Sequence, residues 1–166
     1  MNLTEAPLPE LFDIKEITGS RLEFWEFVDI LRKKYPPLEW VPEARKLSLE
    51  TSFPSESLTL LVQLAGQPVA VLTGNEYTEY RSRKIGFDVK YMIVDPEYQN
   101  RGIGSRLLNI IKSKTEYQSI SLIPSPIGVI SLSKSYRETK LIEFYVKRGF
   151  YSDDGSGQQM IWDRQT

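Results

Sequence analysis

Apolar positions repeat with the period of a helix in several parts of the chain. In the clearest part, the residues that share one helical face are Ile103, Leu107, Ile110 and Ile111. We expect this helix to continue to about Glu116. Two further helices are predicted to begin at capping boxes, in which a glutamate follows a serine by three residues. Ser20 with Glu23 would open a helix over residues 21–34, and Ser135 with Glu138 one over residues 139–148. Pro36 is expected to end the first helix and Gly149 the second.

Apolar and alternating runs predict the strands, and turn residues separate them. The expected strands are residues 11–18, 57–64, 68–74, 85–94, 117–123 and 158–163. A short additional helical segment is expected within residues 38–50. The order of these elements indicates a mixed α/β fold, in which one helix crosses over between the strands at 85–94 and 117–123.

Composition narrows the class of protein. The 166 residues fit one domain, and 40% hydrophobic with 26% charged residues are typical of a globular protein. The net charge of −1 provides no general attraction to nucleic acid or to acidic membranes. The first ten residues lack the basic and apolar regions of a signal peptide, and no apolar run reaches the ~18 residues of a membrane span. We therefore expect a cytoplasmic protein with neither nucleic-acid nor membrane partners.

The chain contains no cysteine and no histidine. The first absence removes disulfides, thiolate nucleophiles and cysteine-based zinc sites, and the second removes the most common general base and metal ligand. Nucleophilic triads that depend on histidine are excluded as well. Any chemistry must rest on carboxylates, tyrosines, lysines and backbone groups, and we expect no bound metal.

A glycine-rich turn lies between a predicted strand and a predicted helix. It reads Gln99-Asn100-Arg101-Gly102-Ile103-Gly104, directly after the strand that ends at Val94 and the turn that follows it. Such a turn exposes backbone N–H groups at the positive end of a helix, where they can bind a phosphate group. The P-loop string is absent, and the third glycine of a dinucleotide fingerprint would fall at Leu107. Both of these nucleotide sites are therefore excluded.

The turn fits the pattern Q/R-x-x-G-x-G/A, by which the sequence resembles the GCN5-related N-acetyltransferase (GNAT) superfamily. "MIVDPEYQ" before the turn and "FYVKRGF" (144–150) after it strengthen the resemblance, which covers roughly residues 57–163. It implies one domain over residues 1–166, with a mixed central sheet of about six to seven strands, about four flanking helices and splayed central strands. Residues 20–56 would then form the acceptor side, and residues 85–166 the cofactor-binding core.

The resemblance also implies a binding site for acetyl-coenzyme A (acetyl-CoA). In this superfamily the pantetheine arm lies between the splayed strands, and the turn holds the pyrophosphate. Pro124 and Pro126 fit a strand that leaves its neighbour, although prolines that merely end a strand fit equally well. The cofactor-binding residues carried over from the family are Met92, Ile93, Val94, Gln99, Asn100, Arg101, Gly102, Ile103, Gly104 and Ser105.

Two side chains are candidates for proton transfer. Asp88 lies 11 residues before Gln99, where histone-type members carry a catalytic glutamate, but it also fits a surface carboxylate at a strand end. Tyr145 matches the tyrosine that protonates the departing thiolate, and its spacing from Leu141 also fits a buried core tyrosine. An asparagine that is common near the start of this helix is missing from residues 137–139.

The expected function is transfer of the acetyl group from acetyl-CoA directly to a primary amine of a small molecule or a protein, without a covalent enzyme intermediate. A non-catalytic CoA-binding regulatory domain is the alternative, and the chain is expected to be a monomer or a homodimer. The aromatic residues of 24–40 could line an acceptor slot, or Phe24, Val28 and Leu31 could be a core stripe. The polar segment 75–84 could contact substrate, or could be a solvated hairpin end.

Overall fold

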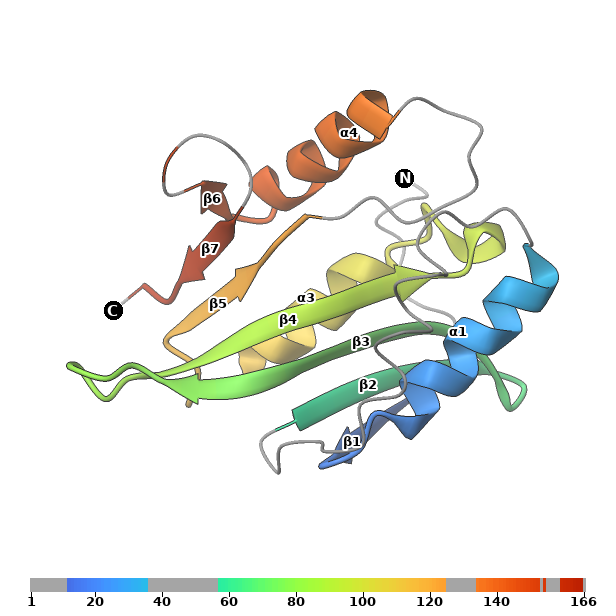
Figure 1. Cartoon of the computed structure of the whole chain (residues 1–166), viewed down its shortest axis with the longest axis horizontal. Helices are drawn as coiled ribbons and strands as arrows, with labels where there is room; N and C mark the ends of the chain where they lie inside the picture. The colour runs from blue at the N-terminus through green and yellow to red at the C-terminus, as the bar shows by residue number, and fades with distance from the viewer. Residues whose placement is uncertain (1–11, 36–56, 125–133, 153, 155–158, 166) are drawn as a thin grey trace.

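The centre of the molecule is a seven-stranded mixed sheet in the order β1-β2-β3-β4-β5-β7-β6 (Figure 1). The computed structural model describes residues 12–35, 57–124, 134–152, 154 and 159–165. The strands are β1 (Phe12–Thr18), β2 (Ser57–Leu64), β3 (Gln67–Thr78), β4 (Ile85–Val94), β5 (Ser119–Leu122), β6 (Tyr151–Ser152) and β7 (Met160–Asp163). The helices are α1 (Leu22–Lys34), the 3-10 turn η2 (Pro96–Tyr98), α3 (Ile103–Ser113) and α4 (Lys134–Val146). The predicted mixed α/β fold is confirmed.

The sheet is antiparallel from β1 to β4, and β5 then pairs with β4 in parallel. Helix α3 makes the crossover between β4 and β5, as the element order predicts. β3 is longer than the predicted 68–74, because its polar end continues in register with β4: Asn75 lies opposite Asp88, and Tyr77 opposite Gly86. The two-residue strand β6 was not predicted, and the helical segment expected within 38–50 lies outside the described residues.

Side chains from distant segments set the ends of the helices. α3 ends at Ser113 rather than near Glu116, because the Arg164 guanidinium donates to the carbonyls of Lys112 (2.6 Å) and Lys114 (3.0 Å). At the start of α1 the expected capping box is wrong. The Ser20 hydroxyl accepts from the Leu22 N–H (3.2 Å) and faces the Glu23 carboxylate, while Arg21 holds the cap position.

At the start of α4 the predicted capping box is wrong too. The helix begins at Lys134, so Ser135 lies inside it rather than at its cap. The strand that precedes α4 is also shorter than predicted, since β5 covers Ser119–Leu122 and not 117–123. Among the described residues, no helix combines the length and the hydropathy that crossing a membrane requires.

Each face of the sheet carries its own core. On one face α3 and α4 pack against the strands, through residues that include Leu107, Ile111 and Tyr145. On the other face α1 packs against Leu61, Val71 and Ile93, through its buried side chains Phe24, Phe27, Val28 and Leu31. In Figure 1, α1 lies in front of the sheet and α3 behind it. The core-stripe reading of the α1 residues is therefore correct, and Phe24 is not available to line an acceptor slot.

β4 and β5 pair over only part of their length. Their register runs from Gly86 opposite Ser119 to Val89 opposite Leu122, whereas β4 continues to Val94. Within the described residues, the segment Lys90–Val94 therefore has a partner strand on the β3 side alone. A β-bulge marks the same point, because Thr73 lies opposite Tyr91 and Gly74 opposite Val89. The bulge leaves Lys90 without an opposite residue and bends β4 where the two strands part. These are the expected splayed central strands.

Candidate active site

The glycine turn connects the unpaired end of β4 to α3. Asn100 and Gly102 both have left-handed backbone conformations, with φ of 63° and 81°. Gly102 stands at the N-cap of α3, and such a conformation favours glycine because a Cβ would be strained there. The Gln99 side chain donates to the Val94 carbonyl at 3.1 Å, which holds the turn against the strand end. The Arg101 guanidinium lies over the Tyr98 ring, 5.1 Å from its centre.

The backbone of this turn offers a row of hydrogen-bond donors. The first backbone bond of α3 is made by the Arg106 N–H, which donates to the Gly102 carbonyl at 3.0 Å. Among the described residues, the N–H groups from Asn100 to Ser105 have no acceptor. Because they lie at the positive end of the α3 dipole, they form an anion site.

Helix α4 packs against the same turn and closes it from one side. A Cβ added at Gly104 would lie 3.2 Å from Cζ of Phe144 and 3.6 Å from Cε of Met92. The Arg148 guanidinium donates from Nε to the Ser105 hydroxyl at 2.7 Å and lies over the Phe144 ring, 3.5 Å from its centre. At Gly104 the missing side chain therefore makes room for Phe144 of the same chain. Ser105 uses one oxygen lone pair to anchor α4.

Tyr145 lies on the α3–α4 face of the sheet and is 5% exposed. Its ring meets those of Phe144 and Phe150 edge to face, with centres 5.2 Å and 5.6 Å apart. Burial raises the pKa of the Tyr145 hydroxyl well above its ordinary value, although the charge of Arg148 lowers it. The hydroxyl is therefore protonated at neutral pH. The position has the burial of a core tyrosine, which its spacing also allowed.

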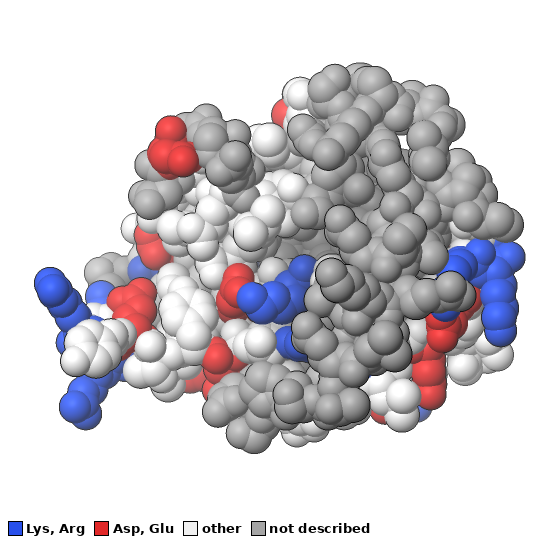
Figure 2. Space-filling model, viewed as in Figure 1, with Lys and Arg blue, Asp and Glu red and all other residues white. Residues whose placement is uncertain are grey.

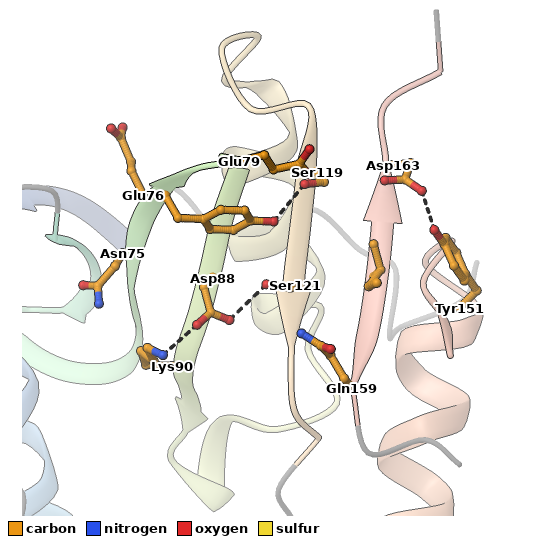
Figure 3. Close-up of a pocket in the computed structure, with 12 residues that line it drawn as sticks. Asn75, Glu76, Glu79, Asp88, Lys90, Ser119, Ser121, Tyr151, Gln159 and Asp163 are labelled. Carbon is orange, nitrogen blue, oxygen red and sulfur yellow. Dashed lines mark hydrogen bonds and ion pairs between the residues drawn. The ribbon is translucent and has the colours of Figure 1, made fainter. Parts of the chain in front are cut away.

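Asp88 lies on the opposite face of the sheet, one residue before the pairing of β4 with β5 ends. One carboxylate oxygen accepts from the Ser121 hydroxyl at 3.0 Å, and the other pairs with the Lys90 ammonium at 2.6 Å (Figure 3). Its side chain is 31% exposed. Asp88 is thus a positioned carboxylate beside the splay rather than a plain surface residue.

A pocket of about 540 Å³ surrounds Asp88 and extends across the strands towards β6. We call it the polar pocket. Figure 3 shows the side chains that line it, drawn from β3, β4, β5, β6 and β7. Its lining residues are Asn75, Glu76, Tyr77, Glu79, Asp88, Lys90, Ser119, Ser121, Tyr151, Gln159, Ile161 and Asp163. In Figure 2, acidic and basic side chains lie together over the middle of β4 and β5 on this face.

Hydrogen bonds between strands hold the walls of the polar pocket. The Tyr77 ring crosses Gly86 so closely that a Cβ there would lie 2.3 Å from its Cζ. This approach brings the Tyr77 hydroxyl within 2.9 Å of the Ser119 hydroxyl. At the far end the Tyr151 hydroxyl donates to the Asp163 carboxylate at 2.5 Å. Gly86 is therefore required by the close crossing of an aromatic ring.

The end of β4 is also tied to α1. The buried Asp95 carboxylate accepts from the Tyr35 hydroxyl (2.7 Å), the Lys34 ammonium (3.0 Å) and the Glu97 N–H (2.9 Å). Burial alone would raise the pKa of Asp95. The three donors outweigh that effect and hold the pKa below its ordinary value. Asp95 thus links the C-terminal end of α1 to the turn η2, which leads into the glycine turn.

Comparison with known proteins decides the family. The family model described as "Acetyltransferase (GNAT) domain" matches residues 55–152, which is more than half of the chain. This chain belongs to the GNAT acetyltransferase family. The matched residues include the strands β2, β3, β4, β5 and β6, the glycine turn, α3 and α4, while β1 and β7 lie outside the match.

Solved structures share the GNAT fold at low sequence identity. One is a glucosamine N-acetyltransferase region of a fungal multi-domain GH3 beta-N-acetylglucosaminidase, with TM-score 0.64 and 17% identity over 89% of this chain. This chain spans only 18% of that protein. An aminoglycoside N-acetyltransferase in complex with CoA has TM-score 0.56 and 12% identity, over 89% of this chain and 92% of that one.

A third structure is the ribosomal-protein-alanine N-acetyltransferase of Brucella melitensis biovar Abortus 2308. It has TM-score 0.54 and 14% identity, over 93% of this chain and 97% of that one. A comparison with curated protein sequences found no match. Because all three structures are far below 25% identity, they establish the fold of this GNAT domain, and its substrates must be inferred from the site.

The expected cofactor residues of the GNAT domain fall into two groups. Met92 and Val94 are half-buried on the α3–α4 face, whereas Ile93 is buried beneath α1. The second group forms the turn, where the side chains of Gln99, Asn100 and Arg101 are exposed and that of Ile103 is buried. The structure brings both groups together, since the Gln99 side chain contacts the Val94 carbonyl and Met92 approaches Gly104.

Most residues of the polar pocket were not predicted from the sequence. Lys90, Ser121 and Gln159 come from three different strands or their ends, and only the register of the sheet makes them neighbours. One signal was available: the alternating serines of "SISL" would face Asp88 if the two strands were parallel and in this register. In the segment 75–84, Glu79 lines the polar pocket and residues 80–84 form an exposed hairpin tip, as one of the two alternatives predicts. Contact of this segment with substrate stays a prediction.

Proposed function

We propose that this GNAT domain is an acetyl-CoA-dependent N-acetyltransferase, which transfers the acetyl group directly to a primary amine. One observation carries the proposal: β4 continues past β5, and its unpaired end leads into a turn with free N–H groups. Acetyl-CoA needs both features, an extended edge for its amide-bearing arm and an anion site for its pyrophosphate. In this proposal the cofactor lies along Lys90–Val94 and the glycine turn.

The residues present fit the cofactor. Opposite residues of an antiparallel pair alternate in the direction of their backbone groups, so within Lys90–Val94 some N–H and C=O groups point away from β3. Those groups would pair with the amides of the pantetheine arm, as an added strand does. The N–H groups from Asn100 to Ser105 would bind the pyrophosphate, and Arg101 would add a positive charge.

We assign proton removal to Asp88. An amine with the pKa of lysine, about 10.4, costs about 4.6 kcal/mol to deprotonate at pH 7, so a nearby base is needed. Asp88 lies on the open face, beside the point where the strands part, and its Lys90 and Ser121 contacts hold the carboxylate in place. A base positioned in this way contributes about 10²–10⁴-fold to a rate.

We assign proton donation to Tyr145. Its hydroxyl is protonated at neutral pH, as that of an ordinary tyrosine is, and it lies on the face from which the cofactor sulfur would leave. Asp88 would first take one proton from the ammonium form of the acceptor and pass it to solvent. As the new C–N bond forms and the C–S bond breaks, Asp88 would take the second nitrogen proton and Tyr145 would protonate the sulfur. Solvent then restores both groups, and no enzyme bond to the acetyl group is required.

The known relatives support an amine as acceptor. The names of the three structures compared above specify a glucosamine, an aminoglycoside and a ribosomal-protein alanine. These acceptors differ in size and charge, and they share an amine. The common chemistry supports N-acetylation here without selecting among the acceptors.

The test is a calorimetric titration of the full chain with acetyl-CoA, with CoA and with ATP, followed by thiol release in the presence of amines. We expect micromolar binding of both CoA species, none of ATP, and thiol release that depends on the amine. Binding without amine-dependent release from any acceptor would favour the non-catalytic CoA-binding alternative. Absence of acetyl-CoA binding at millimolar concentration would refute the proposal.

A further inference from the structure

The polar pocket offers more hydrogen-bonding groups than acetyl transfer itself requires. Its volume of about 540 Å³ lies in the range of pockets that enclose a small ligand. Among its lining residues, Ile161 is the one aliphatic side chain, and the others carry hydroxyl, amide, carboxylate or ammonium groups. Most cofactor and drug pockets have the reverse composition, with a few polar groups in an apolar lining.

Internal pairs hold several of these polar groups in fixed positions. Asp88 is paired with Lys90 and Ser121, Tyr77 with Ser119, and Tyr151 with Asp163. Ser119 and Ser121 are almost fully buried, at 8% and 6% exposed, so they form a floor whose hydroxyls cannot reorient freely. A ligand therefore meets a preorganised set of donors and acceptors.

Other groups of the polar pocket are available to a ligand. The Gln159 side chain points across β5 towards Ser121 in Figure 3, and within the described residues its amide has no hydrogen-bond partner. Each paired carboxylate retains further lone pairs, since an ionised carboxylate accepts about four hydrogen bonds. The pocket therefore presents alternating donors and acceptors over several strand spacings.

The polar pocket has a net negative charge, which favours a cationic ligand. Its acidic side chains are Glu76, Glu79, Asp88 and Asp163, and Lys90 is its one basic side chain. Lys90 pairs with Asp88 and offsets one of the four acidic charges, so the lining keeps a net negative charge. An incoming ammonium group is attracted, and an acidic acceptor is repelled.

We propose that the acetyl acceptor is a small polyhydroxylated amine, an amino sugar or an aminocyclitol, bound in the polar pocket with its amine at Asp88. This inference rests on the function proposed above and specifies its substrate class. Sugar hydroxyls both donate and accept, so they match a lining in which carboxylates and hydroxyls alternate with the amide of Gln159.

Two other acceptors fit less well. An apolar amine would bury carboxylates and hydroxyls without partners, and unpaired buried polar groups are costly. An extended peptide would gain affinity by adding to a free strand edge. β5, the floor of the pocket, is already paired with β4 on one side and β7 on the other, so its edges are occupied.

The experiment compares acceptors of matched ring size. With saturating acetyl-CoA, kcat/KM is measured for galactosamine, for cyclohexylamine, and for a short peptide with a free N-terminus. Each value is expressed per concentration of unprotonated amine, so that the different basicities of the amines do not enter the comparison. We expect galactosamine to exceed cyclohexylamine by about a hundredfold, because each lost charge-assisted hydrogen bond costs about tenfold. Equal or better use of cyclohexylamine or of the peptide overturns the inference while leaving the proposed function intact.

Variants locate the binding site. Asp163→Asn and Gln159→Ala should each raise the KM for galactosamine about tenfold, with the affinity for acetyl-CoA unchanged. Asp13→Asn is the matched control, because Asp13 is an exposed carboxylate on β1, outside the pocket, and should change neither constant. An unchanged KM in both pocket variants overturns the inference.

If acetyl-CoA does not bind, a calorimetric titration with galactosamine alone still tests whether the polar pocket binds an amino sugar. Saturable binding that is weakened by Asp163→Asn supports the assignment of the polar pocket, independently of the proposed reaction. No binding, or equal binding by the Asp163→Asn variant, overturns it.

Discussion

The two faces of β4 differ sharply although one short strand forms both. On the face beneath α1, Asp88 lies in an open, charged pocket with hydroxyls as its neighbours. On the α3–α4 face, Tyr145 lies among aromatic rings and is almost fully buried. Within the described residues, β4 has no β5 partner from Lys90 onwards, two residues after Asp88.

The difference shows how one sheet can separate two proton transfers. A group that removes a proton from an acceptor must exchange with solvent, and Asp88 is partly exposed. A group that protonates a leaving sulfur must carry a proton at neutral pH and be shielded from solvent, and Tyr145 is a buried tyrosine. In the proposed reaction the two groups act from opposite faces through one opening.

The change with the largest expected effect is Tyr145→Phe on the buried face. It removes the proton donor and preserves the ring contacts with Phe144 and Phe150, so kcat should fall about 10²–10⁴-fold with little change in stability. Steady-state kinetics beside calorimetry of CoA binding would measure it. A full kcat would assign Tyr145 to core packing alone.

On the open face, Asp88→Asn should lower kcat about a hundredfold at neutral pH. The amide can still accept from Ser121, but it cannot take a proton from the acceptor and no longer pairs with the Lys90 charge. Rates with amines of decreasing pKa provide the sharper readout. The loss should shrink for weakly basic amines, and a constant loss would contradict the role of a base.

Gly104→Val tests the junction between the turn and the buried face. The added side chain meets Phe144, so we expect a loss of about 1–3 kcal/mol in the free energy of unfolding, together with weaker CoA binding. Adding Phe144→Leu should restore much of the stability. If Phe144→Leu also restores the affinity for CoA, Gly104 acts by allowing Phe144 to pack. A direct effect of Gly104→Val on the N–H groups of the turn would then not be needed to explain the weaker CoA binding.

The smallest effect is expected at Asp95, which ties α1 on one face to the turn. Because its folded pKa is below the unfolded value of about 3.9, its contribution is present above that pH and is lost as pH falls through the folded pKa. Asp95→Asn should therefore cost about 1–3 kcal/mol of unfolding free energy at pH 7, and less below about pH 3.9.

Denaturant titrations at two pH values, with Asp13→Asn as the surface control, measure the Asp95 contribution. A difference between wild type and Asp95→Asn that does not shrink at low pH would show that this link does not depend on the charge of Asp95.

Local sequence patterns could predict the order of the elements, the glycine turn and the parallel crossover. They depend on residues that are close in the chain, as in the helical face of Ile103 and Leu107. The ends of elements were less predictable, because distant side chains set them. Arg164 ends α3, and the crossing of Tyr77 over Gly86 keeps β3 in register with β4.

The site could be predicted only where it follows the chain. The turn residues were expected as a group, but the close approach of Phe144 to Gly104 depends on the docking of α4. The polar pocket depends on the register of β4, β5 and β7, and a shift of one residue would turn Ser121 away from Asp88. A single sequence does not specify such non-local register.

The short pairing of β4 with β5 also has a consequence for folding cooperativity. Strands β1 to β4 form one antiparallel group, whereas β5 to β7 form a second group that meets it along Gly86–Val89. A narrow seam between two groups favours partial opening, in which one group loosens before the other. A ligand that lies in the gap between β4 and β5 and contacts both strands would hold the two groups of strands together. Its binding should slow amide hydrogen exchange in β7, well beyond any residue it touches.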